Sequence, residues 1–299
     1  CAVDADSVLQ RDSLQRVAKP FLEDPTVIAC GGSVRIANGC QISGGFLEKI
    51  GLPKSFLARV QIVEYLRAFL FGRMGWSPIN AMLIISGAFG IFKKDAVTDV
   101  GGYRTDTIGE DMELVVRLHK HYRLAGKPYK IQFVPDPICW TEAPENLKTL
   151  RLQRTRWQRG LAESLSMNIG LLFHPKGGTA GWLAFPFTVI FEWLGPLIEV
   201  VGYVFMFLLF YFGMISSTAF LVFLLVAIGF GLLLSMSALL LEEMSFHIYP
   251  KASHLAWLML AALVENFGYR QLTAVWRLQG LLSWLFFSKG HWGTMKRKK

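Results

Sequence analysis

The chain has 299 residues, of which 53% are hydrophobic, and it carries a formal net charge of +9 at pH 7. A wholly soluble domain of this length usually has a smaller apolar share and a more balanced charge, so these values disfavour a purely soluble protein. The apolar excess is concentrated from residue 183 onward. We therefore predict a globular domain over 1–180 and a transmembrane domain over 181–299 that ends in a basic cytoplasmic tail.

The chain starts with a short apolar run, Cys1-Ala2-Val3, which predicts the end of a buried strand. Asp4 and Asp6 follow directly, so both carboxylates lie where this strand leaves its sheet. Ligands of open α/β sheets bind outside the carboxyl ends of the strands. Two carboxylates in a turn at that edge can bind one Mg²⁺ or Mn²⁺ that bridges to a nucleotide diphosphate. An Asp-x-Asp pair also occurs by chance, and a turn or helix-cap role is the simpler interpretation.

A second apolar run, Met82–Ile85, predicts a buried strand that enters a turn of small residues at Ser86, Gly87 and Ala88. Glycine in such a turn allows the backbone to approach a ligand closely. A plain strand–turn–strand unit is the alternative interpretation.

The segment TDTIGEDMELVVRLHKH predicts a helix after Gly109, because apolar residues recur there at helical spacing. Glu110 and Asp111 then occupy its first turn, where the helix dipole stabilises carboxylates, and this alone would account for them. An ionised aspartate at a helix start inside a cleft can also take the proton of a sugar hydroxyl. His119 and His121 point apart on this helix, which predicts solvent exposure and not a shared metal.

The segment QRTRWQRG lies in a helix that we expect to run from Pro144 past Leu165. Gln153, Arg156 and Trp157 are spaced so that they share one helix face. Arginine can bind a diphosphate through two hydrogen bonds, and a tryptophan ring can stack on a sugar. A basic helix at the membrane surface, with its tryptophan among the lipid headgroups, is the alternative interpretation.

The apolar part of the chain predicts three or four membrane crossings. The segment 219–241 contains 23 residues without a charged side chain, which is long enough to span a bilayer. A second span is expected over about 194–214, after an interfacial segment, and 255–287 fits either one span with an amphipathic helix or a helical hairpin. Glu192 and Glu199 share a helix face, and they fit either a protein-facing position or the headgroup level.

Positive charge is clustered at 148–159 and at 296–299, and both clusters flank the apolar part. The positive-inside rule explains them more simply than nucleic-acid binding and places both in the cytoplasm. The four cysteines show no metal-ligand spacing, which favours reduced thiols. We therefore predict a multi-pass protein of the plasma or inner membrane, with a cytoplasmic catalytic domain and no nucleic-acid partner.

Taken together and in this order, these motifs ahead of apolar helices resemble the membrane-embedded family 2 glycosyltransferases, which include cellulose, hyaluronan and poly-N-acetylglucosamine synthases. The pattern of that family is a DxD pair, an ED-type base and a QxxRW helix. It is matched here by Asp4–Asp6, Glu110–Asp111 and Gln153–Trp157. The segments SGAFG and VGGY also resemble the acceptor-side loop of the family and the turn that follows it.

The resemblance implies an α/β fold of the GT-A type (Rossmann-like) and an inverting transfer from a UDP-sugar to a growing β-linked polysaccharide. It further implies that the membrane helices help to form a path for the product. The implied roles are metal binding by Asp4 and Asp6, diphosphate binding by Asp4, Asp6, Gln153, Arg156 and Trp157, base catalysis by Asp111, and acceptor binding by Ser86, Gly87, Glu110 and Trp157.

In that family the strands that hold the nucleotide base precede the DxD pair, so we expect a catalytic domain that is truncated at its N-terminus and has an unpaired sheet edge. Two other functions remain open. The first is a glycolipid synthase that adds one sugar to a lipid acceptor, and the second is a non-catalytic membrane scaffold with a degenerate transferase domain. The expected partners are a UDP-sugar donor, a polysaccharide or lipid acceptor, and the lipid bilayer.

Overall fold

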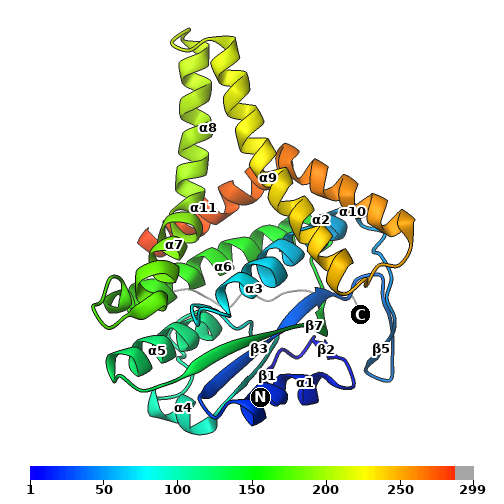
Figure 1. Ribbon diagram of the computed structural model, residues 1–299. Helices are drawn as coiled ribbons and strands as arrows, with labels where there is room; N and C mark the ends of the chain where they lie inside the picture. The colour runs from blue at the N-terminus through cyan, green and yellow to red at the C-terminus, as the bar shows by residue number, and fades with distance from the viewer. Residues whose placement is uncertain (287–299) are drawn as a thin grey trace.

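The computed structural model describes residues 1–286, so the basic tail predicted at 296–299 lies outside the described residues. A five-stranded sheet in the order β1-β6-β3-β7-β2 forms the lower part of the molecule in Figure 1. The strands in that order are Ala2–Val3, Phe89–Phe92, Val27–Ile36, Lys130–Thr141 and Val8–Leu9. The central strands β3 and β7 are parallel, and the other neighbours are antiparallel. A separate hairpin consists of β4 (Gln41–Ser43) and β5 (Phe46–Lys49).

Strand β3 is the centre of the hydrophobic core. Every one of its residues is buried, which fits a sequence of small and β-branched residues covered on both faces. A Cβ atom at Gly32 would lie 2.7 Å from Ile138 Cδ1 and 2.9 Å from Phe89 Cδ1. The glycine therefore allows β7 and β6 to pack tightly against this strand.

Two predictions about strands have different outcomes. The strand end before Asp4 is confirmed, since β1 stops at Val3 and a turn follows, but the predicted burial is wrong because β1 is an edge strand and Val3 is 43% exposed. The strand predicted over Met82–Ile85 is wrong, because this segment is largely buried but has no regular secondary structure and pairs with no strand. The strand β6 begins only after the turn at Gly87 and Ala88, and it pairs with the edge of β3.

The helices of the first part of the chain pack on the sheet and above it (Figure 1). They are α1 (Ser13–Glu23), α2 (Phe56–Tyr65), the π-helix η1 (Leu66–Phe71), α3 (Gly72–Trp76), α4 (Lys94–Asp99), α5 (Glu110–Leu124), α6 (Leu147–Met167) and the short 3₁₀-helix η2 (Ile169–Leu171). The predicted start of α5 after Gly109 is confirmed. Helix α6 begins three residues later than Pro144 suggested, because Asn146 caps it by accepting a 2.9 Å hydrogen bond from the Thr149 backbone N–H.

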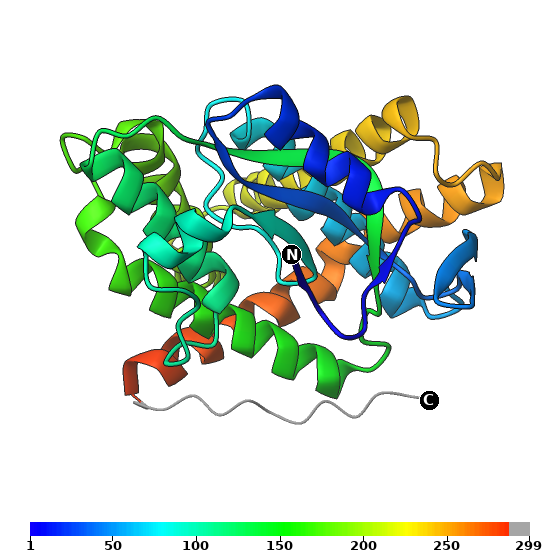
Figure 2. The same cartoon turned by 90° about the horizontal axis from the view of Figure 1, so that it is seen from below.

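The second part of the chain consists of helices joined by turns and loops within the described residues. It comprises η3 (Ala180–Ala184), α7 (Phe185–Phe187), η4 (Thr188–Trp193), α8 (Gly195–Tyr211), α9 (Ser217–Ser245), α10 (Ala252–Val264), η5 (Glu265–Tyr269) and α11 (Arg270–Phe286). Figure 1 shows α8 and α9 rising from the body as a hairpin, while α10 and α11 lie across its base. From below, Figure 2 shows the sheet and α1 in front of these helices.

Within residues 1–286, α9 is the one helix that is long and apolar enough to cross a membrane, with a mean hydropathy of 2.7. The segments Ala180–Trp193 and Gly195–Tyr211 meet at a 45° bend and add a second candidate only if the bent pair counts as one span. The described helices thus offer fewer spans than the three or four predicted. All four cysteines are free.

Candidate functional site

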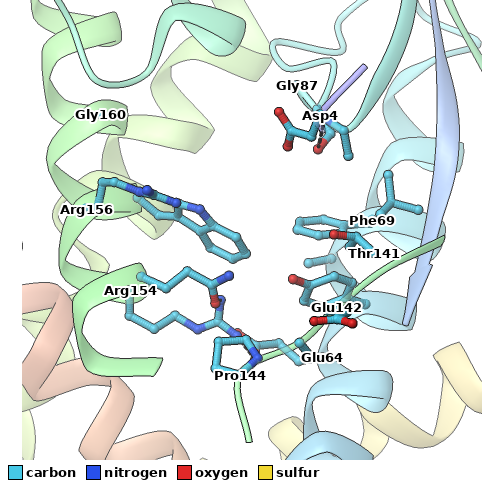
Figure 3. A pocket seen from close by; sticks show the side chains of 18 of the residues that line it. Asp4, Glu64, Phe69, Gly87, Thr141, Glu142, Pro144, Arg154, Arg156 and Gly160 are labelled. Atoms are coloured by element: carbon cyan, nitrogen blue, oxygen red, sulfur yellow. Dashed lines mark hydrogen bonds and ion pairs between the residues drawn. The ribbon is translucent and has the colours of Figure 1, made fainter. Parts of the chain in front are cut away.

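A cavity of about 1300 Å³ opens between the end of β1, the turn before β6, the first turn of α5, the motif-bearing face of α6, and η1. Figure 3 shows Arg154 and Arg156 of α6 facing Phe69 and Glu142 across it. Every site residue that the sequence predicts lines this one cavity, which we call the cleft. These residues are Asp4, Asp6, Ser86, Gly87, Glu110, Asp111, Gln153, Arg156 and Trp157.

The acidic end of the cleft contains the carboxylates of Asp4 and Asp6. The backbone turns directly after β1, where the Ser7 N–H donates to the Asp4 carbonyl oxygen at 3.0 Å. A Cβ atom at Gly87 would lie 3.6 Å from Asp4 Oδ1 and 3.7 Å from Asp111 Oδ2. The small-residue turn therefore brings its backbone close to both acids, which is the close approach that glycine permits.

The fit of this end for a divalent cation depends on the substrate. No cluster of three or more His, Cys, Asp or Glu side chains suited to a metal occurs within residues 1–286. Asp4 and Asp6 can supply two carboxylate ligands, and Mg²⁺ is usually held by one or two carboxylates together with substrate phosphates. The two acids therefore fit a cation that arrives with a diphosphate, and not a cation held by the protein alone.

Asp111 is held firmly at the start of α5. Its Oδ2 accepts a 3.0 Å hydrogen bond from the Gly87 N–H, and its Oδ1 accepts one of 2.7 Å from the Met112 N–H. Burial raises the pKa of Asp111 above its usual value, although these two bonds and the charge of Arg73 act in the opposite direction. Each carboxylate oxygen has a further lone pair, so the side chain can still accept a proton from a group in the cleft.

Two glycines bring Asp111 close to the motif-bearing helix. A Cβ atom at Gly109 would lie 2.7 Å from the Gly160 carbonyl oxygen, and one at Gly160 would lie 3.0 Å from Gly109 Cα. Glu163 holds the same junction, since its Oε2 accepts 2.9 Å hydrogen bonds from Thr107 Oγ1 and the Ile108 N–H. Neither the glycine contact nor Glu163 is predicted from the sequence, because both depend on residues about 50 positions apart.

The α6 face contributes an aromatic wall. Trp157 is 38% exposed, and its ring lies 6.1 Å from that of Phe69 and 6.4 Å from that of Tyr65, centroid to centroid. Arg154, which the face prediction does not include, lies 4.5 Å over the Trp157 ring and is only 2% exposed. Its Nη2 donates to Glu64 Oε2 at 2.6 Å, and this contact positions both the arginine and the tryptophan. An aromatic surface of this kind can stack on a sugar ring.

Three arginines of the positive cluster at 148–159 have partners or positions inside the fold. Arg154 pairs with Glu64 and Arg159 pairs with Glu163, while Arg156 lines the cleft. Burial raises the pKa of the Glu110 carboxyl there, and the charge of Arg156 acts in the opposite direction. The cytoplasmic position of the cluster stays a prediction.

The helical part of the chain, residues 180–286, contributes Glu192 and Arg277 to the lining of the cleft. Gln158 donates through Nε2 to the backbone oxygens of Glu192 and Trp193 at 3.0 and 2.9 Å, and its Oε1 accepts from Arg277 Nε at 2.8 Å. The two acids of this region, which the sequence assigns either to protein-facing positions or to the headgroup level, pair with arginines of α11, and these pairs fit both interpretations. Glu192 pairs with Arg277, and Glu199 pairs with Arg270.

The predicted exposure of His119 is wrong. Its ring is fully buried, with Nδ1 2.6 Å from the Tyr129 hydroxyl and Nε2 2.9 Å from the Met82 carbonyl oxygen. Burial lowers the pKa of His119 to about 4, so the ring is neutral at physiological pH. It supports the segment before the Ser86 turn and lies outside the cleft lining.

A model of the family described as glycosyl transferase family group 2 matches residues 2–287. The poly-β-1,6-N-acetyl-D-glucosamine synthase of Staphylococcus aureus (strain COL) is 35% identical over 165 residues, which are 54% of this chain and 35% of that protein. The enzyme of the same name from Staphylococcus epidermidis is 32% identical over 163 residues, with the same two coverages. The match thus spans about a third of the length of these curated relatives. A solved structure, a mannosyltransferase from Pyrobaculum calidifontis in complex with GDP-Man and Mn²⁺, is 18% identical with a TM-score of 0.48, covering 95% of this chain and 61% of that chain.

Proposed function

The chain belongs to glycosyl transferase family group 2, and from this premise we propose that it transfers a sugar from a UDP-sugar, with inversion, to a growing β-linked polysaccharide at a membrane. Membership of the family confirms the predicted α/β fold of the GT-A type and the predicted glycosyltransferase activity. The observation that carries the finer proposal is the convergence of the three motifs on one cleft. The two-domain division at about residue 180 is part of the same proposal.

In this proposal Asp111 is the base. The acceptor hydroxyl oxygen forms a bond to the anomeric carbon of the donor while the bond from that carbon to the diphosphate breaks. The hydroxyl proton passes to Asp111, and UDP leaves with the electron pair of the broken bond. The backbone hydrogen bonds from Gly87 and Met112 fix the carboxylate, so little reorganisation is needed when the acceptor arrives.

The donor diphosphate would lie between the acidic end and the α6 face. Asp4 and Asp6 would hold Mg²⁺ or Mn²⁺, which when bound supplies positive charge to the diphosphate. Arg156 lines the cleft and would bind the departing phosphate through its planar N–H groups, while Gln153 adds an amide donor. These roles explain why basic side chains of α6 and carboxylates of the β1 turn face one cavity.

The acceptor would lie along the aromatic wall, with Trp157 as the stacking surface and the Ser86 turn and Glu110 beside it. A polysaccharide chain is the proposed acceptor, because the cavity is far larger than one sugar needs and is lined by both aromatic and polar side chains. N-acetylglucosamine is the first donor sugar to test, since the two curated relatives are named for a polymer of it.

The helical part would hold the enzyme in the membrane, with the catalytic part on the cytoplasmic side. Helix α9 has the length and hydropathy of a span. Arg67 lines the cleft and donates to Ser235 of α9, and Arg277 of α11 also lines the cleft. In this proposal a path for the product would begin beside these two residues.

The experiment is to incubate the complete protein in membranes with UDP-N-acetylglucosamine and other labelled UDP-sugars, and to size the products over time. Products that lengthen with time support the polysaccharide proposal, whereas a single transfer to lipid would replace it with the glycolipid synthase. Absence of transfer from every donor, with Asp111→Asn as the matched inactive control, would overturn the proposed function.

A further inference from the structure

Arg73 is a buried cation of the cleft that none of the sequence motifs includes. It lies on α3, directly after the π-helix η1. It lines the cleft although it is only 4% exposed. Its guanidinium carbon lies 4.5 Å over the ring of Phe69, which belongs to the aromatic wall. The arginine is therefore oriented by that ring within the cleft.

The other arginines that are at least nine-tenths buried within residues 1–286 each have an acidic partner. Arg35 pairs with Glu242, Arg154 with Glu64 and Arg159 with Glu163, at distances from 2.6 to 2.9 Å. Arg73 is the exception among the described residues, since no acidic side chain there forms an ion pair with it. Its buried Nη1 also has no hydrogen-bond partner in that part of the chain.

A guanidinium removed from water without such partners is unfavourable unless another group supplies them. The closest compensation comes from Asp111, whose negative charge acts on Arg73 without direct ion-pair contact. Both side chains line the same cavity, and the charge of one acts on the other. A polar oxygen of a ligand bound in the cleft would supply the missing hydrogen-bond acceptor, because a guanidinium offers five N–H donors.

We propose that Arg73 is an acceptor-binding residue, which donates a hydrogen bond to a hydroxyl or carbonyl oxygen of the acceptor sugar and so orients the attacking hydroxyl toward Asp111. This inference rests on the proposed function. It predicts that loss of the arginine affects the acceptor and leaves the donor unaffected, since Arg156 and the DxD acids lie on the other elements of the cleft.

The test uses the complete protein in detergent or membranes, with UDP-N-acetylglucosamine as donor and a β-1,6-linked N-acetylglucosamine oligomer as acceptor. Arg73→Met removes every N–H group while keeping a long side chain, Arg73→Lys keeps the charge, and Arg16→Met on the exposed face of α1 is the matched control. The measured quantities are KM for acceptor and for donor, kcat, and the slow release of UDP without acceptor.

We expect Arg73→Met to raise the acceptor KM about tenfold or more, which is the loss of one hydrogen bond to a charged group. The donor KM and the acceptor-independent release of UDP stay at the level of the parent protein and of Arg16→Met, and Arg73→Lys recovers part of the acceptor affinity. An unchanged acceptor KM would overturn the proposal. A parallel rise of both KM values with a lower Tm would replace it with a purely structural role.

A binding measurement distinguishes failure of this inference from failure of the proposed function. If the parent protein transfers no sugar, direct binding of the same oligomer is measured by calorimetry for the parent protein and for Arg73→Met. Binding that depends on Arg73 supports the inference, and binding that ignores it, or no binding, overturns it.

Discussion

The catalytic part and the helical part of this chain differ in where their charged and apolar side chains lie. Around the cleft, carboxylates and guanidinium groups lie inside the fold, as Asp111 and Arg154 do. On α8 and α9 the apolar side chains point outward, with Phe205 58% exposed, Leu225 64% and Phe230 65%. An apolar surface of this extent is stable only against an apolar environment, whereas buried charges need fixed polar partners. The contrast supports the proposal that α8 and α9 lie in a membrane while the catalytic part lies in water.

Ion pairs join the two parts. Glu242 near the end of α9 contacts Arg35 of β3 at 2.7 Å, and both side chains are about 96% buried. Arg67 of η1 pairs with Glu265 of η5, and the same arginine donates to Ser235 of α9. Since η1 also carries Phe69 of the cleft wall, one short helical segment contacts both the helical part and the cleft.

The largest effect is expected at the catalytic end. Asp111→Asn should lower transfer by about 10²–10⁴-fold, because the amide cannot accept the acceptor proton, while UDP-sugar binding persists. The Tm should fall only modestly, because the amide keeps one of the two oxygens that accept the Gly87 and Met112 N–H bonds and also avoids a buried charge. Asp106→Asn, at an exposed aspartate of the preceding loop paired with Arg104, is the control with normal turnover. Unchanged turnover in Asp111→Asn would rule out the base.

The ion pair between Arg35 and Glu242, which joins the two parts, should give the next largest effect. Arg35→Met leaves Glu242 as an unpaired buried acid, which costs about 3–5 kcal/mol of unfolding free energy. The double variant Arg35→Met/Glu242→Leu removes both charges, and most of the lost stability should return. Denaturant or thermal unfolding of the detergent-solubilised protein measures this, and equal stability of the single and double variants would show that the pair does not couple the two parts.

The helical part can be tested with lysine substitutions of exposed leucines. Leu225→Lys places a charge at the outward face of α9, at a cost of about 3 kcal/mol if that face lies in lipid. The protein retained in carbonate-washed membranes should therefore decrease. Leu22→Lys on α1 is the matched control, because Leu22 is 86% exposed in the catalytic part and should tolerate the charge. Equal retention of both variants would contradict the proposal that α9 lies in lipid while α1 lies in water.

The sequence predicts the features that depend on local pattern. The strand end before Asp4, the start of α5 at Glu110 and the shared face of Gln153 and Trp157 follow from neighbouring residues and periodicity. The long apolar run of α9 is equally local. Spacing alone identifies such elements because each is formed by residues within one or two turns.

Features that depend on distant contacts are not predictable in this way. An apolar run such as Met82–Ile85 looks the same whether or not a strand edge is available, and here β6 occupies the edge of β3. His119 is buried because Tyr129 and the Met82 carbonyl satisfy its ring. Arg73 and Glu163 are single charged residues without a motif, and their place in the cleft region is evident only from the folded chain.

The smallest expected effect is a shift in the pH dependence of transfer. Asp111 must be ionised to accept a proton, and burial raises its pKa above the usual 3.8, so transfer should be lost on acidification at a higher pH than for an ordinary aspartate. Arg73 favours the ionised form, and therefore Arg73→Met should move this acidic limb further upward. Glu110 also has a raised pKa, through burial and the charge of Asp111, and Glu110→Gln separates the two acids because the limb of Asp111 should remain but move slightly downward.

The unfolding free energy should respond to Asp111 in the opposite direction. Since the folded pKa is raised, the folded state binds the proton more tightly, and this group adds stability as the pH falls through that pKa. Asp111→Asn should remove this contribution and leave the rest of the stability profile as it is. The pair of profiles, kcat/KM and unfolding free energy against pH, measures both effects on one carboxyl. Identical stability profiles of the parent protein and Asp111→Asn would show that the carboxyl is hydrated, and the acidic limb would then belong to another group of the cleft.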